Sequence, residues 1–316
     1  MIKPKALRPG DTLGFVAPAS PTKTPEGVER SVEAARALGY NVVVGESCMN
    51  VHGYFAGDDA MRARDLNRMF ADDAIDAIVC IRGGYGAPRI LDQLDYDLAR
   101  RHPKLLIGYS DITALHIAYG QKSGLVTMHA PMPSTEWIAD DFDDFTSAGL
   151  WRALTSTEPL GAIENPPGFP VEGLNGGVAR GRLVGGNLCL VAALNGTPWE
   201  IDARGAILVL EDIGEYVHRL DRMLTTLRLS GKFEQCAGIV LGGFTDCPPE
   251  CPDRSLTLRQ VIEEVVLPSG KPVLSGYMIG HCSPKVTIPL GVTATIDADK
   301  GRLTIDEAAL TAPQGA

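Results

Sequence analysis

The sequence has no long apolar run and no cluster of basic residues. Of its 316 residues, 29 are Lys or Arg and 39 are Asp or Glu, which gives a formal net charge of −10. A surface this acidic repels phosphate backbones and anionic lipid, so we expect neither a nucleic-acid nor a membrane partner. No apolar stretch reaches the roughly 20 residues that span a bilayer. The run 12–20 resembles a signal peptide but is too short, and a buried first strand explains it better.

Cysteines are few, and no pairing pattern relates them. There are seven, an odd number, and most lie inside apolar segments. Reduced thiols in a reducing compartment account for this pattern, so we expect a cytoplasmic protein. Cys247 and Cys251 have no second pair at the spacing of a zinc site, and we expect no metal and no cofactor.

The first half of the chain alternates apolar strands with amphipathic helices. The apolar run 75–81 is typical of a central strand that is covered on both faces. The pattern predicts a parallel α/β sheet with helices on both sides. Arg62, Arg64, Arg100 and Arg101 are expected on solvated helix faces. The expected strands are 13–17, 40–44, 75–81, 105–107 and 126–128, and the expected helices are 26–38, 58–70, 88–101 and 111–122.

Proline, glycine and asparagine dominate residues 156–182, where the alternation stops. The sequence therefore predicts a domain at 1–155, a linker at 156–182 and a second domain at 183–316. The second domain is mixed. Helices are expected at 186–194, 216–229 and 256–266, strands at 206–210 and 238–241, and three antiparallel strands between 286 and 305.

Ser110 follows an apolar strand and precedes a helix directly. The segment Gly108-Tyr109-Ser110-Asp111 is how a nucleophile elbow is built, with helix amides facing incoming negative charge. The match is partial, because Ile112 stands where the usual elbow has glycine. A helix cap formed by Ser110 or Asp111 is an equally good interpretation of this segment alone.

A glycine-rich loop, Arg82-Gly83-Gly84-Tyr85-Gly86, follows the central strand. It matches neither the dinucleotide-binding nor the P-loop pattern. Glycines let backbone amides approach a ligand closely, so Gly83 or Gly84 could supply one oxyanion donor and the Asp111 amide the other. A plain structural turn is the alternative.

The sequence offers several bases and acids. His281 lies in a loop between Gly280 and Pro284 and leads His129 only slightly, since a satisfied buried histidine is commoner than a catalytic one. Glu211 ends an apolar strand, where a carboxylate can orient an imidazole. Asp212 and Glu215 fit as caps of the following helix.

Together these segments resemble the LD-carboxypeptidases. The resemblance covers nearly the whole chain. It implies a flavodoxin-like N-terminal domain, a smaller mixed α/β C-terminal domain, often a homodimer, and a Ser–His–Glu triad of Ser110, His281 and Glu211 in a cleft between the domains. The marks that carry it are 82–86, 108–111, 181–188, 210–212 and 280–281.

The resemblance also implies a function. The expected reaction is hydrolysis of an L,D-peptide bond, with release of terminal D-Ala from a cytoplasmic murein tetrapeptide during peptidoglycan recycling. Arg82 is the candidate for binding the terminal carboxylate, against a packing role. One alternative is a microcin C immunity-type hydrolase that cleaves aminoacyl-nucleotides. Trp199 is then available to pack against the adenine, although it could equally be a core anchor. Another is a two-domain binding protein with no catalysis.

Overall fold

The computed structural model describes residues 1–312, which form two compact units. Of the described residues, unit 1 comprises 1–158, 287–291 and 308–312, and unit 2 comprises 159–286 and 292–307. The chain therefore re-enters unit 1 twice after leaving it, which a division into 1–155 and 183–316 does not foresee. Residues 313–316 of that expected second domain lie outside the described residues.

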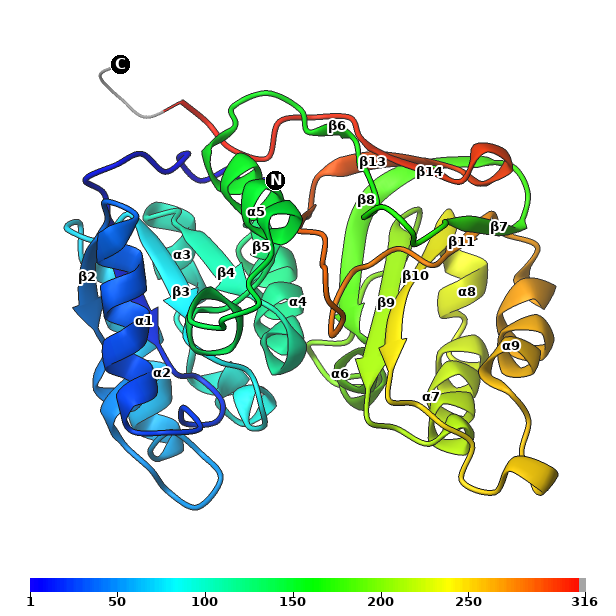
Figure 1. Ribbon diagram of the computed structural model, residues 1–316, viewed down its shortest axis with the longest axis horizontal. Coiled ribbons are helices and arrows are strands. Elements are labelled where there is room, and N and C mark those ends of the chain that lie inside the picture. The colour runs from blue at the N-terminus through cyan, green and yellow to red at the C-terminus, as the bar shows by residue number, and fades with distance from the viewer. Residues whose placement is uncertain (313–316) are drawn as a thin grey trace. The chain divides into compact units, whose positions relative to one another are not determined.

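Unit 1 contains a six-stranded sheet in the order β12-β5-β4-β3-β1-β2 (Figure 1). Five strands are parallel and follow the flavodoxin-like order 2-1-3-4-5, as expected. The sixth, β12, is antiparallel to β5 and comes from late in the chain. The strands are β1 (Thr12–Val16), β2 (Asn41–Val44), β3 (Ala77–Cys80), β4 (Leu105–Gly108), β5 (Thr127–His129) and β12 (Ile288–Leu290).

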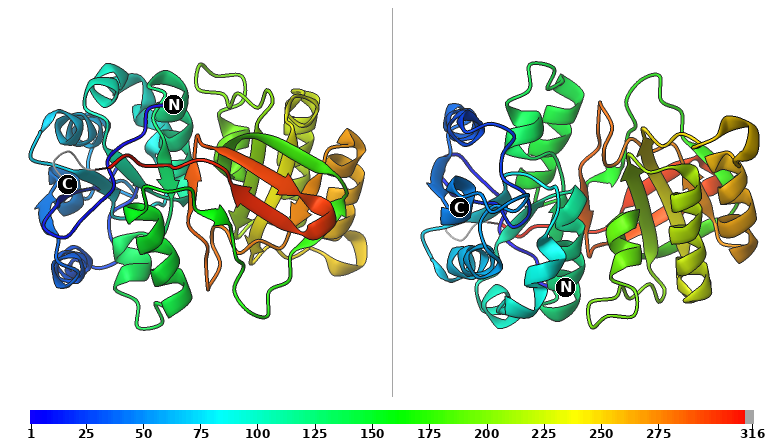
Figure 2. Two further views of the ribbon diagram at one scale, coloured as in Figure 1. Left: turned by 90° about the horizontal axis from the view of Figure 1, so that it is seen from above. Right: turned by 90° about the horizontal axis from the view of Figure 1, so that it is seen from below.

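Helices cover both faces of this sheet (Figure 2). On one face lie α1 (Glu26–Ala37) and α5 (Asp144–Thr155), and on the other lie α2 (Asp59–Ala71), α3 (Tyr96–Arg101) and α4 (Thr113–Lys122). The helix expected at 88–101 is broken into the 3₁₀ segment η2 (Ala87–Gln93) and α3. The break occurs because Asp95 caps α3, its carboxylate accepting the amides of Asp97 and Leu98.

Unit 2 contains an eight-stranded sheet in the order β6-β14-β13-β8-β9-β10-β11-β7. Strands β8 to β11 are parallel, and the strands outside them pair antiparallel. This mixed sheet agrees with the expected class of the second domain. The strands are β6 (Gly161–Ala162), β7 (Glu172–Asn175), β8 (Val178–Asn187), β9 (Ile207–Ile213), β10 (Gly238–Thr245), β11 (Val273–Ser275), β13 (Thr293–Asp297) and β14 (Arg302–Ile305).

The segment expected as a linker is part of this sheet, so that prediction was wrong. It contains β6, β7 and the start of β8. Its glycines allow close backbone packing rather than flexibility: a Cβ at Gly173 would lie 1.9 Å from the carbonyl oxygen of Ala298. Turn-forming composition alone does not separate a linker from strands that pack this tightly.

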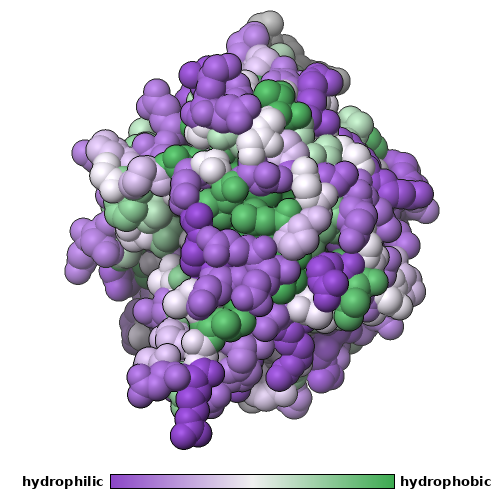
Figure 3. All heavy atoms as spheres, turned by 90° about the vertical axis from the view of Figure 1, so that its right-hand side faces the viewer, coloured by the Kyte–Doolittle hydropathy of each residue, from purple (hydrophilic) through white to green (hydrophobic). Residues whose placement is uncertain are grey.

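The helices of unit 2 pack beside one another along its sheet. They are α6 (Leu188–Ala193), α7 (Val217–Leu229), α8 (Lys232–Gln235) and α9 (Leu258–Val261), and α7 contacts the other three. Figure 3 shows a mostly hydrophilic face with an apolar area near its centre. No helix in residues 1–312 has both the length and the apolarity needed to cross a membrane.

Candidate active site

Ser110 sits at a strained turn directly after β4. Its backbone φ is +67°, and among residues 1–312 the only other non-glycine residue with positive φ is Asp246. An L-residue pays conformational energy for this left-handed geometry, and such strain concentrates at functional sites. The turn continues into η3 (Ser110–Ile112) and α4, whose N-cap positions are Tyr109 and Ile112. Ser110 therefore occupies neither cap position, which favours the nucleophile interpretation over the cap.

Asp111 points away from its own helix. Its carboxylate is 2% exposed and accepts the amide of Ala87, the first residue of η2, at 2.6 Å. Burial raises the pKa of Asp111 to about 6, while the Ala87 amide and the charge of Arg62 oppose the rise. The side chain thus holds the start of η2, where the glycine-rich loop ends, and its own backbone amide remains the candidate oxyanion donor.

The glycine-rich loop lies against Ser110. A Cβ built on Gly83 would lie 2.8 Å from the Ser110 Cβ and 3.0 Å from its Oγ, so only glycine fits there. Gly84 has φ +114° and is solvent-exposed. The structure therefore places Gly83 against Ser110, the residue before Asp111, within unit 1. The guanidinium of Arg82, the candidate for the terminal carboxylate, donates to the carbonyl of Pro21 at 2.6 Å.

Two buried histidines lie behind the turn. His116 Nε2 is 2.8 Å from the carbonyl oxygen of Gly108, and burial lowers the pKa of His116 to about 3, so the ring is neutral. His129 at the end of β5 packs near His116 and Tyr109, with ring centroids 6.3 and 5.8 Å away. The Tyr109 hydroxyl donates to Glu136 at 2.6 Å. These contacts support the turn from behind.

In unit 2, Glu211 and His281 form a hydrogen-bonded pair. Glu211 Oε2 lies 2.7 Å from His281 Nδ1 and also accepts the backbone amide of His281 at 3.2 Å. The carboxylate is fully buried, and His281 retains 13% side-chain exposure. Because a carboxylate only accepts, Nδ1 carries the proton, and in the neutral ring Nε2 is then the accepting nitrogen. A general base needs this tautomer.

Gly280 makes this pairing sterically possible. Its φ is +100°, and a Cβ there would lie 2.2 Å from Glu211 Oε2. Gly242 on β10 has a similar role, since a Cβ there would lie 3.1 Å from the Glu211 Cβ. The His281 loop can therefore approach β9 closely only because both positions lack side chains.

Asp212, the next residue on β9, faces the other side of the sheet. Its carboxylate accepts from Asn187 Nδ2 at 3.0 Å and from the amide of Cys189 at 2.9 Å. Burial raises the pKa of Asp212 to about 6. Asp212 therefore anchors α6, and the expectation that it caps the following helix was wrong. Glu215 pairs instead with Arg219 on α7 at 3.4 Å.

Arg62 is buried, and its expected place on a solvated helix face was wrong. It is 0% exposed, while Arg64 is exposed. The signal was present: Arg62 precedes Leu66 by four residues and Met69 by seven, so the helical period places all three on one face.

Within residues 1–312, no group of three or more His, Cys, Asp or Glu could hold a metal ion.

Comparison with known proteins now identifies the family. Residues 13–130 match the LD-carboxypeptidase N-terminal domain, and residues 180–296 match the LD-carboxypeptidase C-terminal domain. The chain belongs to the LD-carboxypeptidase family. The resemblance seen in the sequence is thereby confirmed, and membership supports a hydrolase activity of the carboxypeptidase type.

Two groups of relatives occur in this family. A probable murein peptide carboxypeptidase of Bacillus subtilis is 43% identical over 304 residues, covering 96% of this chain and 94% of that one. The solved muramoyltetrapeptide carboxypeptidase from Oxalobacter formigenes has a TM-score of 0.82 at 27% identity, covering 95% and 99%. The microcin C7 self-immunity protein MccF, known by that name in Escherichia coli, has a solved structure with a TM-score of 0.89 at 27% identity, covering 98% and 100%.

Proposed function

We propose that this protein is a serine carboxypeptidase in which Ser110 is the nucleophile, His281 the general base and Glu211 the residue that orients it. The observation that carries the proposal is the 2.7 Å contact between Glu211 and His281 Nδ1, because it fixes the tautomer that can accept a proton at Nε2. The strained backbone of Ser110 supports its role as the partner nucleophile. Ser110 belongs to unit 1, and Glu211 and His281 belong to unit 2.

The reaction then proceeds in two halves. Ser110 Oγ attacks the carbonyl carbon of the scissile amide while His281 Nε2 takes the hydroxyl proton. Glu211 stabilises the imidazolium that forms. His281 next protonates the leaving amine, the C–N bond breaks, and an ester to Ser110 remains. Water, deprotonated by His281, hydrolyses this ester and restores the Ser110 hydroxyl.

Negative charge develops on the carbonyl oxygen in both halves. The amide of Asp111 and that of Gly83 or Gly84 are the proposed donors to it. Losing one such donor lowers the rate by about 10²–10³-fold in other acyl-transfer enzymes. The close contact between Gly83 and Ser110 supports this assignment.

The proposed substrate is a murein tetrapeptide, from which the enzyme releases terminal D-Ala by cleaving an L,D-peptide bond. The support is the likeness to the murein peptide carboxypeptidase of Bacillus subtilis. Peptidoglycan recycling in the cytoplasm, a homodimer and a reaction without a cofactor belong to the same proposal. The resemblance of the sequence to its family is their only support.

The test is to incubate purified protein and its Ser110→Ala variant with an L,D-linked murein tetrapeptide and to measure D-Ala by mass spectrometry. We expect release by wild type alone. Equal release by both proteins would show that Ser110 is not the nucleophile. No release by wild type would show that the tetrapeptide is not the substrate.

The high TM-score with MccF favours a second candidate, a hydrolase of aminoacyl-nucleotide conjugates. Such an enzyme needs an aromatic side chain to pack against the nucleobase, and the half-buried Trp199 of unit 2 could supply it. Turnover of an aminoacyl-sulfamoyl adenosine, compared with that of the tetrapeptide, separates the two. Saturable ligand binding that Ser110→Ala leaves unaltered, with no product, would instead favour a binding protein without catalysis.

A further inference from the structure

The loop after β1 is hydrogen-bonded to the loop after β3. These two strands are neighbours at the point where the strand order of the sheet reverses direction. The amide of Ser20 donates to the carbonyl of Gly83 at 3.2 Å, and the amide of Tyr85 donates to Ser20 Oγ at 3.1 Å. In a sheet of this strand order, ligands bind where these two strands end. Since Gly83 also touches Ser110, whatever fixes this pair of loops fixes the amides nearest the proposed nucleophile.

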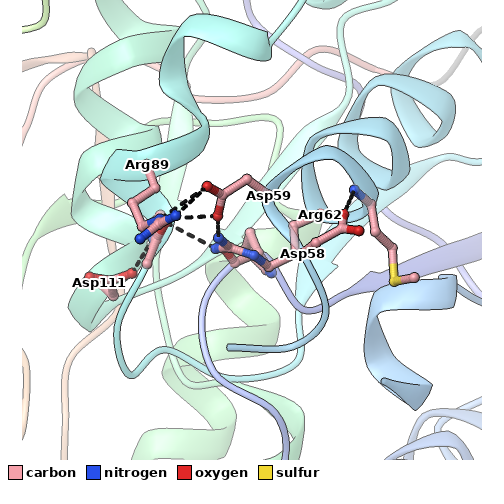
Figure 4. A network of polar contacts seen from close by, with 9 residues as sticks. Asp58, Asp59, Arg62, Arg89 and Asp111 are labelled. Carbon is pink, nitrogen blue, oxygen red and sulfur yellow. Dashed lines mark hydrogen bonds and ion pairs between the residues drawn. The ribbon is translucent and has the colours of Figure 1, made fainter. Parts of the chain in front are cut away.

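A fully buried arginine joins the same two loops a second time. Arg62 Nη1 donates to the carbonyl of Pro18 at 2.6 Å and to that of Gly86 at 2.9 Å. Its guanidinium lies 4.8 Å from the Phe55 ring centroid and is ion-paired with Asp59. Asp59 is held in turn by the exposed Arg89 at 2.7 Å (Figure 4).

Asp111 holds the far end of the glycine-rich loop. Its carboxylate accepts a hydrogen bond from the amide of Ala87. Ala87 directly follows Gly86, whose carbonyl Arg62 binds. Arg62 thus binds Gly86, the last residue of the loop, and Asp111, the residue after Ser110, binds the next residue, Ala87.

The arrangement is costly for packing alone. Burying a guanidinium is expensive unless its geometry is excellent, and an apolar side chain of similar volume often stabilises a fold better. Arg62 Nε has no hydrogen-bond partner among the described residues. The planar guanidinium binds the two carbonyls through Nη1 and Asp59 through Nη2, a fork that neither a methionine nor the point charge of lysine reproduces.

We propose that Arg62 and Asp111 are positioning residues that hold the 83–86 loop against the Ser110 turn, and so hold the amides that receive charge in the transition state. The inference rests on the proposed role of Ser110. Neither side chain needs to touch substrate. Because misplacing a reacting group by about 1 Å can cost about 10²-fold, we expect the defect in kcat and not in KM.

The test for Arg62 uses a matched buried cation. Lys104 is 6% exposed, and its Nζ donates to the carbonyls of Met69 and Asp72, but it precedes β4 and so lies at the opposite end of the strand from Ser110. We expect Arg62→Met to lower kcat for D-Ala release by about 10²-fold per folded molecule, Arg62→Lys by less, and KM to stay within about threefold. Lys104→Met should lower the melting temperature but leave kcat unchanged.

The test for Asp111 uses a matched buried anion. Asp65 is 2% exposed, and its carboxylate accepts the amide of Ser47 at 2.6 Å. We expect Asp111→Ala to lower kcat by about 10²-fold, and Asp111→Asn, which keeps an oxygen for the Ala87 amide, to recover most of that loss. Asp65→Asn should leave kcat unchanged. If Arg62→Met does not fold, the Asp111 pair decides.

A second readout separates this inference from the substrate proposal. A fluorophosphonate reacts covalently with an activated serine, and its phosphoryl oxygen gains negative charge where the carbonyl oxygen of a substrate would. Its labelling rate should therefore rank the variants in the same order as kcat does, with no tetrapeptide present. If wild type is labelled but releases no D-Ala, the tetrapeptide is not the substrate, and the positioning role is still tested by the labelling rates. Variants that lose no more rate than their Lys104 and Asp65 controls would overturn the positioning role. Wild type that fails to label would overturn it together with the role of Ser110.

Discussion

In unit 1 the proposed nucleophile is held by consecutive residues, whereas in unit 2 the proposed base is held by a contact across 70 residues of chain. The geometry of the Ser110 turn depends on one backbone angle, the φ of +67° at Ser110. The Glu211–His281 pair stores its geometry in a close approach of loop and strand that Gly280 permits. The geometry of the Ser110 turn should therefore respond to substitutions that change backbone strain, and that of the Glu211–His281 pair to substitutions that change side-chain packing.

The largest effect should come from Ser110. We expect both Ser110→Ala and Ser110→Gly to lower kcat by about 10⁵–10⁶-fold, as loss of a serine nucleophile does elsewhere. Only glycine relieves the positive φ, so Ser110→Gly should unfold with a free energy about 1 kcal/mol higher than Ser110→Ala. Denaturant titration of both measures this. Equal stability of the two variants would show that the turn carries no strain.

Glu211→Gln should rank next. The amide can donate to His281 Nδ1 and so favour the wrong tautomer, and the corresponding change in other triads costs about 10⁴-fold in kcat. Steady-state kinetics and a thermal melt on the same preparation measure it. A loss below about tenfold in folded protein would mean that the base is not held by Glu211.

Gly280→Ala tests whether close approach is what holds the pair. The new Cβ would lie 2.2 Å from Glu211 Oε2, so we expect kcat to fall by about 10²-fold or more. The matched control is Gly270→Ala, where φ is +68° but nothing lies within 4 Å. It should cost only the backbone strain, about 1 kcal/mol, and leave kcat intact. If both variants kept full activity, steric access at Gly280 would be irrelevant.

The pH dependence of stability should report on Asp111. Its folded pKa is raised to about 6, so between pH 4 and pH 6 the folded state keeps a proton that the unfolded state releases. Its contribution to the free energy of unfolding therefore falls as pH rises through that window, by about 3 kcal/mol. Asp111→Asn removes this fall, so the variant should gain on wild type by up to that amount between pH 4 and pH 7. A constant difference would contradict the raised pKa.

The smallest effect should come from Arg82. If its guanidinium binds the terminal carboxylate of the substrate, Arg82→Ala should raise KM by about 10-fold or more, the value of one charge-assisted hydrogen bond. Arg82→Lys should recover part of this. An unchanged KM would leave Arg82 with its structural bond to the Pro21 carbonyl alone.

The two regions also differ in how far the sequence predicted them. The Ser110 turn and the glycine-rich loop are contiguous motifs, and the βαβ pattern placed both at the ends of neighbouring strands. The pair Glu211–His281 needed the family resemblance, because the sequence favours Glu211 over Asp212 only by its position nearer the strand, and His281 over His129 only slightly. Their roles separate only through strand alternation, which turns one carboxylate toward the His281 loop and the other toward α6.

Other features depended on packing that composition does not reveal. Residues 156–182 have turn chemistry, yet they form strands because Gly173 allows the backbone at Ala298 to approach. Arg62 was assigned to solvent by residue type, although its helical position is that of a core residue. Both errors have one cause, since burial is decided by partners distant in sequence.

The most direct test of the account is whether Ser110 reacts only when His281 is present. Wild type, His281→Ala and the Gly270→Ala control would be treated with a fluorophosphonate, and the labelled residue identified by mass spectrometry. The account predicts labelling of Ser110 in wild type and control, and a rate at least about 10³-fold lower in His281→Ala. Labelling of Ser110 at the wild-type rate in His281→Ala would show that the two residues do not act as one triad.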